Sequence, residues 1–163
     1  MGATDQMIES NAAYARGFDK AGLAAAPARR VAVLACMDAR LDPARMLGLE
    51  EGDAHVIRNA GGFATDDAIR SLAASQRLLG TEEIVLIHHT ECGMFSVNDA
   101  EFAERLAEET GQQPDWSPQP PRDLDESVRE SARRIVESPF VPNTSSVRGF
   151  VYDVRTGALR EVR

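Results

Sequence analysis

The chain has few of the residues that mark several large classes of protein. Only 2 of its 163 residues are cysteine, which does not support a disulfide-stabilised fold. Its 18 basic residues are outnumbered by 26 acidic ones, so a broad nucleic-acid-binding surface is not expected. Its apolar runs fall far short of the roughly 20 residues that span a bilayer. The first ten residues also lack the basic flank and apolar core of a signal peptide, so we expect a cytoplasmic protein.

The length of the chain is enough for one domain with a substantial core. A chain of this size buries about 70% of the surface that it exposes when unfolded. We therefore expect a single domain over residues 1–163. Within it, residues 4–19 predict an amphipathic helix and residues 21–30 a linker, so that residues 1–30 form an N-terminal helical arm.

Strand and helix patterns alternate along the rest of the chain. Apolar runs predict strands at residues 31–36, 55–58 and 83–88, and a strand pair joined by a tight turn at residues 147–154 and 158–162. Capped helical patterns cover residues 42–48, 65–80, 99–110 and 124–137. Residues 112–122 hold four prolines and predict a surface or interface loop. This order predicts an α/β fold with a central, mostly parallel sheet of four strands, an antiparallel edge strand and flanking helices.

Three potential metal ligands follow two of the predicted strands. Cys36 ends the first strand, while His89 and Cys92 follow the third with two residues between them. In an open parallel sheet, ligands bind outside the carboxyl ends of the strands, so these side chains can converge. Two thiolates and an imidazole are a zinc ligand set, and three protein ligands leave one position free, as in catalytic zinc sites.

A carboxylate and a guanidinium follow Cys36 closely. Asp38 and Arg40 are two residues apart, so Arg40 can hold Asp38 through charge-assisted hydrogen bonds. Asp38 would then face the metal as a hydrogen-bond acceptor. Asp38 could instead turn to the metal, which would close the free position.

These motifs together resemble those of the β-class carbonic anhydrases, in their compact bacterial and archaeal form. The resemblance rests on Cys36-x-Asp38-x-Arg40, on His89-x-x-Cys92-Gly93 and on the loop Arg58-Asn59-Ala60-Gly61 between them. It is strong over residues 31–95 and weaker over the last strand pair.

The resemblance implies a carbonate dehydratase with one Zn²⁺ per chain on Cys36, His89 and Cys92. In such an enzyme a hydroxide on the metal attacks carbon dioxide, and the products are bicarbonate and a proton. Asp38 and Arg40 would be the catalytic pair, and the Gly93 amide would face the substrate. The resemblance also implies a homodimer, which can pair into a tetramer, with the N-terminal helix reaching over its partner.

Alternatives remain at this point. Relatives of the compact members hydrolyse carbonyl sulfide or carbon disulfide with the same ligands. A structural zinc with Asp38 as a permanent fourth ligand would make the chain a scaffold protein. His55 and His88 are interpreted as packing or hydrogen-bonding strand residues, with proton relay as the lesser possibility, and Arg58 as an interface ion-pair residue.

Overall fold

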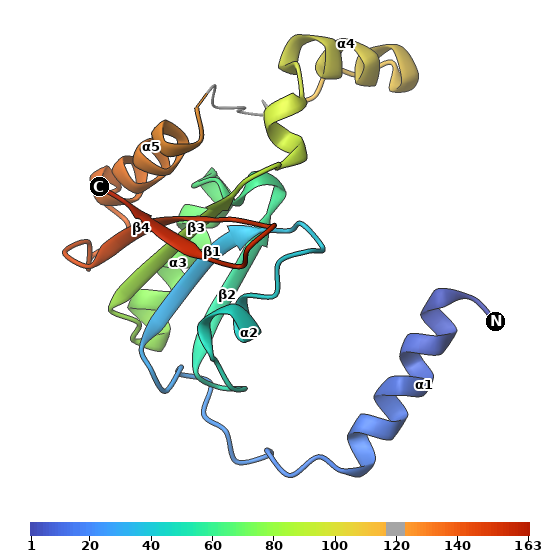
Figure 1. The fold of residues 1–163 in the computed structure, drawn as a ribbon, viewed down its shortest axis with the longest axis vertical. Coiled ribbons are helices and arrows are strands. Elements are labelled where there is room, and N and C mark those ends of the chain that lie inside the picture. Colours follow the sequence, from blue (N-terminus) through green and yellow to red (C-terminus); the bar gives the residue numbers. More distant parts are fainter. Residues whose placement is uncertain (117–122) are drawn as a thin grey trace.

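A five-stranded sheet forms the centre of the fold, with the strand order β2-β1-β3-β4-β5 (Figure 1). The computed structural model describes residues 1–116 and 123–163. The strands are β1 (Val31–Cys36), β2 (Ala54–Asn59), β3 (Glu83–His89), β4 (Val147–Tyr152) and β5 (Leu159–Val162). The first four are parallel, and β5 pairs antiparallel with β4 at the edge. The predicted fold class is confirmed.

The helices begin and end close to the predicted boundaries. They are α1 (Ala3–Arg16), α2 (Pro43–Leu47), α3 (Asp66–Leu79), α4 (Asp99–Thr110) and α5 (Leu124–Glu137). Two short 3-10 helices, η1 (Ala60–Gly62) and η2 (Gly93–Ser96), were not predicted. The predicted loop at residues 112–122 lies outside the described residues from residue 117 onward. No helix within the described ranges is long and apolar enough to cross a membrane.

Cap residues explain why the helix boundaries could be predicted. The Thr65 side chain accepts a hydrogen bond from the Ala68 amide at the start of α3, and Gly80 ends that helix in the left-handed conformation. Asp42 caps α2 in the same way, directly before Pro43. Both helices therefore start and stop where local chemistry satisfies their free backbone groups.

The sheet is buried on both faces. Leu34 and Leu86 point into the larger core, which α3 and α5 cover through residues such as Leu72 and Ile135. Val33, Ala35 and Ile87 point to the opposite face, where residues in and after α2 pack against them. Burial on both faces explains why β1 and β3 are continuous apolar runs in the sequence.

The helix α1 stands apart from the sheet as an arm (Figure 1). None of its residues is buried. The arm is fastened near its end, where the Tyr14 hydroxyl donates to Glu51 at 2.6 Å and Lys20 pairs with the same carboxylate. The predicted helical arm and linker are therefore present in the structure.

Candidate metal centre

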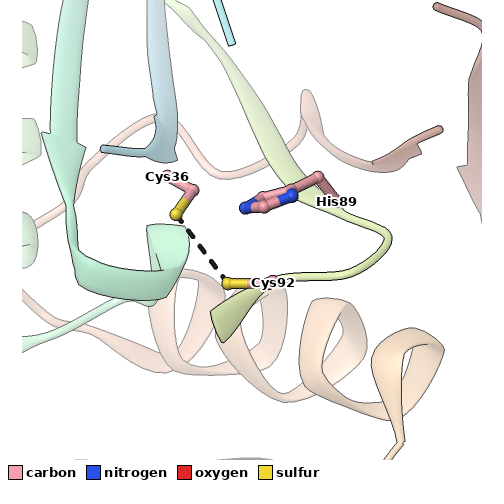
Figure 2. A group of neighbouring side chains, drawn as sticks. All are labelled: Cys36, His89 and Cys92. Carbon is pink, nitrogen blue, oxygen red and sulfur yellow. Dashed lines mark hydrogen bonds between the residues drawn. The ribbon is translucent and has the colours of Figure 1, made fainter. Parts of the chain in front are cut away.

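Three potential ligand atoms converge at the carboxyl edge of the sheet. Cys36 ends β1, His89 ends β3, and Cys92 follows three residues later. Their ligand atoms all lie within 4.8 Å of one another, and all three residues are buried. Figure 2 shows both sulfur atoms and the imidazole turned toward the same small space. The structure thus brings together the three residues that the sequence predicted as ligands.

The imidazole of His89 is prepared to bind a metal through Nε2. Its Nδ1 lies 2.9 Å from the Thr90 carbonyl oxygen, which can only accept, so Nδ1 carries the hydrogen. The opposite nitrogen, Nε2, is buried and has no hydrogen-bond partner among the described residues. A buried nitrogen left without a partner is costly unless a ligand occupies it. The backbone carbonyl therefore fixes the tautomer that a metal requires.

The sulfur geometry matches tetrahedral zinc. Cys36 Sγ and Cys92 Sγ are 3.9 Å apart. Two Zn–S bonds of about 2.3 Å at a tetrahedral angle place the sulfurs roughly 3.8 Å apart. No other metal-ligand cluster of this kind occurs within residues 1–116 and 123–163. The donor set and its spacing therefore fit one zinc ion.

One of the two thiols is readily ionised. A hydrogen bond from Cys92, aided by amides of Asp38 and Gly61, lowers the pKa of Cys36 to about 4. The same hydrogen bond, together with burial, raises the pKa of Cys92. Burial acts to lower the pKa of His89, but the nearby Cys36 thiolate, the Thr90 carbonyl and the Asp38 carboxylate raise it overall. A dication would replace the protons that this cluster shares.

Asp38 lies beside the cluster and is held by Arg40. The Arg40 guanidinium donates from Nε to Oδ1 at 2.9 Å and from Nη2 to Oδ2 at 2.8 Å, and its backbone amide also donates to Oδ1. These hydrogen bonds keep the pKa of Asp38 well below its usual range. Asp38 Oδ2 is 3.8 Å from His89 Nε2. The carboxylate therefore stands next to the metal position while its own oxygens are bound by arginine.

Arg58 fixes the loop that carries both Cys36 and Asp38. Its Nε donates to the Cys36 carbonyl at 2.9 Å, and its Nη2 donates to the Asp38 carbonyl at 2.7 Å. The sequence interpretation of Arg58 as an ion-pair residue missed this role. The two backbone acceptors come from a neighbouring strand end, so no sequence pattern could have pointed to them.

Glu91 is the second residue whose role the sequence did not reveal. It has a positive φ of 56°, which non-glycine residues rarely adopt. Its carbonyl oxygen accepts from Arg40 Nη2 at 3.0 Å, and its carboxylate pairs with Arg155 from the β4–β5 turn. Glu91, in its unusual backbone conformation, therefore provides Arg40 with a hydrogen-bond acceptor in addition to Asp38.

A cleft of about 410 Å³ opens beside the cluster. Its lining residues are His89, Glu91, Cys92, Phe95, Ser96 and Leu124. Gly93, the predicted substrate-binding residue, starts η2 directly after the buried Cys92 and is itself exposed. A Cβ atom at Gly93 would meet nothing within 4 Å, so the space beside it is open. A small molecule can therefore approach the cluster from this side.

The other two histidines do not reach the cleft. His55 Nδ1 lies 2.7 Å from Ser75 Oγ, near the opposite end of the sheet. His88 is fully enclosed, and burial lowers its pKa to about 4. Both act as hydrogen-bonded strand residues, as the sequence predicted, and neither is placed to relay protons to solvent from this cleft.

Comparison with known proteins agrees with this geometry. The sequence profile of a family described as carbonic anhydrase matches residues 31–159. The chain is 56% identical to β-carbonic anhydrase 1 of Mycobacterium tuberculosis over 162 residues, which covers 99% of each protein. It is 37% identical to a carbon disulfide hydrolase of Acidithiobacillus thiooxidans, with 81% of this chain and 76% of that protein covered. The crystal structure of a carbonic anhydrase from Streptococcus mutans superposes with a TM-score of 0.92 at 45% identity, covering 100% of this chain and 99% of that one.

Proposed function

This chain belongs to the β-class carbonic anhydrases, and from that premise we propose how its own residues carry out the reversible hydration of carbon dioxide. The products are bicarbonate and a proton. The observation that carries the proposal is the position of Asp38, which lies 3.8 Å from His89 Nε2 while Arg40 holds it.

Cys36, His89 and Cys92 would hold the zinc ion. Their ligand atoms fit one tetrahedral ion and leave its fourth position open. When bound, zinc lowers the pKa of water and so supplies hydroxide near neutral pH. The Thr90 carbonyl keeps His89 in the tautomer that presents Nε2.

Asp38 would orient the attacking hydroxide. An ionised carboxylate only accepts hydrogen bonds, so Asp38 would accept the hydrogen of a hydroxide beside it and leave an oxygen lone pair facing the carbon of carbon dioxide. Arg40 keeps Asp38 both ionised and in place through two parallel hydrogen bonds. Asp38 and Arg40 are therefore our candidate catalytic residues.

Gly93 would contribute its amide on the cleft side. A backbone N–H directed at a substrate oxygen stabilises the charge that develops there. The exposed position of Gly93 beside Cys92, where an added Cβ would meet nothing within 4 Å, is compatible with such close approach. The cleft would let bicarbonate leave and water enter, and the proton would pass to buffer.

The scaffold alternative needs a different arrangement of Asp38. A permanently closed site would have Asp38 as fourth ligand, separated from Arg40. The bidentate pairing of these two residues favours the open arrangement instead. Measuring turnover and zinc content on the same purified preparation tests the proposal. A structural zinc would give bound metal without activity.

Carbon disulfide and carbonyl sulfide are the competing substrates. The similarity to carbon disulfide hydrolases at 37% identity makes such an activity a second candidate. Initial rates on carbon dioxide, carbon disulfide and carbonyl sulfide should be measured side by side on one zinc-loaded preparation. We expect carbon dioxide hydration to dominate, and a higher kcat/KM on either sulfur compound would contradict that assignment.

We also propose that the enzyme is a homodimer, which can pair into a tetramer. Met7 and Ile8 on α1 and Phe18 just after it are large apolar side chains that are about half exposed or more. A groove of about 420 Å³ between the end of the arm, α2 and β2 exposes Val56. The arm of a second copy is the occupant that we propose for this groove.

We propose the cytoplasm as the location of the enzyme. Two unpaired cysteine thiols serve as zinc ligands only where they stay reduced. Fractionation of the source cells with an antibody against the protein would test this.

A further inference from the structure

His88 connects two elements that otherwise meet only through packing. Its Nε2 lies 3.2 Å from the carbonyl oxygen of Gly62 in η1, and its Nδ1 lies 2.9 Å from Ser127 Oγ near the start of α5. A carbonyl oxygen only accepts, so Nε2 carries the hydrogen and the Ser127 hydroxyl must donate to Nδ1. The row Ser127–His88–Gly62 therefore has one fixed hydrogen-bond direction.

Gly62 lies directly against the backbone that carries Cys36. It has a φ of +73°, and a Cβ atom there would lie 2.8 Å from the Cys36 nitrogen and 3.0 Å from the Ile87 carbonyl oxygen. Its neighbour Gly61, also at positive φ, precedes it in η1. Any shift of Gly62 would therefore displace the backbone of the metal ligand Cys36.

Phe63 links the same histidine to the cleft. Its ring meets His88 edge to face, with centroids 5.3 Å apart, and lies 6.4 Å from the ring of Phe95. Phe95 lines the cleft beside the ligands. The His88 ring is thus fully enclosed and held by two hydrogen bonds and one aromatic contact.

We propose that His88 is a positioning residue for the metal ligand Cys36, acting through the Gly61–Gly62 turn. It fixes the Gly62 carbonyl and so holds Gly62 against the backbone nitrogen of Cys36. Outer partners of this kind orient metal ligands and tune how strongly they bind. The inference rests on the zinc site proposed above and adds a residue outside its ligands and catalytic pair.

A second, half-buried histidine–serine pair provides a control. His55 contacts Ser75 Oγ at 2.7 Å, and it lies in β2 beside Ala32, at the end of the sheet away from Cys36. Removing either histidine takes one hydrogen-bond partner from a serine and costs stability, although Ser75 keeps its hydrogen bond with Thr81. Only the loss of His88 would change the position of Cys36 and so weaken zinc binding.

The experiment compares His88→Leu, His88→Gln and His55→Leu with the unchanged chain, using the zinc-loaded proteins. Zinc affinity is measured by competition with a chromophoric chelator. The thiolate-to-metal absorption band of the Co²⁺-substituted proteins reports the geometry at the sulfur. We expect zinc affinity to fall by about 10- to 100-fold in His88→Leu, with a shifted cobalt band. His88→Gln keeps an N–H near the position of Nε2 and should restore most of the affinity, while His55→Leu should lower stability alone.

Two outcomes would overturn the inference. One is a folded His88→Leu protein with the original zinc affinity and cobalt band, and the other is an equal loss of affinity in His55→Leu. Where His88→Leu does not fold, Ser127→Ala decides, because it removes one hydroxyl only. We expect a smaller but measurable loss of zinc affinity, and an unchanged affinity would refute the role. Absence of zinc binding by the unchanged chain would instead refute the proposed function itself.

Discussion

Asp38 Oδ2 lies 3.8 Å from His89 Nε2, so one carboxylate borders the metal position and is at the same time bound by a guanidinium. Asp38 can accept a hydrogen bond from a nucleophile there only while Arg40 holds it away from the metal. Removing Asp38 should therefore lower turnover in a different way from removing Arg40. This relationship gives the first test of the site.

Replacing Arg40 with alanine should cost activity at every pH that is assayed. Without Arg40 the pKa of Asp38 rises toward its ordinary value of about 3.9, so Asp38 stays ionised near neutral pH and is free to turn to the metal. Asp38→Ala should keep zinc and lose on the order of 100-fold in kcat, typical of a lost proton-handling group. Rates from pH 6 to 9 with parallel zinc analysis measure both. An Arg40→Ala enzyme with unchanged rate and pH profile would show that the pair is only structural.

Zinc should be present at one ion per chain, and its removal should cost both activity and stability. Chelation is expected to abolish turnover, readdition of zinc to restore it, and bound zinc to raise the melting temperature because it binds the native state. Cys92→Ser should lose the metal, since a neutral hydroxyl replaces a thiolate. Elemental analysis and thermal melts measure these effects. Full activity at zinc contents well below one per chain would contradict the assignment.

Arg58→Lys should impair the site although the charge is kept. Lysine has one ammonium group and cannot bridge the Cys36 and Asp38 carbonyls as the guanidinium does. We expect a loss of about 1–3 kcal/mol in stability, from a broken hydrogen bond to a charged donor, and a lower kcat. Arg70→Lys is the control, because Arg70 pairs with Asp67 on the exposed surface of α3. Equal losses of stability and kcat in both variants would show that Arg58 has no special role in holding the Cys36 and Asp38 carbonyls.

Glu91→Gly should leave the fold stable while it weakens the hold on Arg40, because the Glu91 carboxylate also lies 3.7 Å from Arg40 Nη1. Glycine adopts a positive φ without the steric cost of about 1–2 kcal/mol that other residues bear. The exposed pair with Arg155 that is lost contributes at most about 1 kcal/mol. We expect an unchanged or raised melting temperature with a reduced kcat. Arg155→Ala, which keeps the Glu91 backbone, should have a smaller effect on kcat, and the reverse order would contradict this account.

The sequence revealed the ligands because each follows a strand that is recognisable on its own. Cys36 and His89 end runs of apolar residues, and parallel strands place their carboxyl ends at one edge. The Asp38–Arg40 pair could be predicted for a similar reason, since only Ala39 lies between the two residues. These are local patterns combined with one rule of topology.

The residues that the sequence did not reveal act through the backbone of distant segments. Arg58 and His88 bind carbonyl oxygens, which every residue carries, so their partners leave no trace in the residue types. The positive φ of Glu91 was equally hidden, because glutamate is not a residue associated with that conformation. Such contacts become visible only when the fold has placed the elements together.

Met7 and Ile8 are 69% and 64% exposed on α1, an arrangement that favours burial in a second copy of the chain. Ile8→Asp should therefore shift the protein toward the monomer in light scattering at assay concentrations and lower its melting temperature. Ala13→Asp adds the same charge on the side of the helix away from Met7 and Ile8 and should leave the dimer intact. Deletion of residues 1–19 should give a monomer outright. If the unchanged chain is itself a fully active monomer at assay concentration, the arm has no such role.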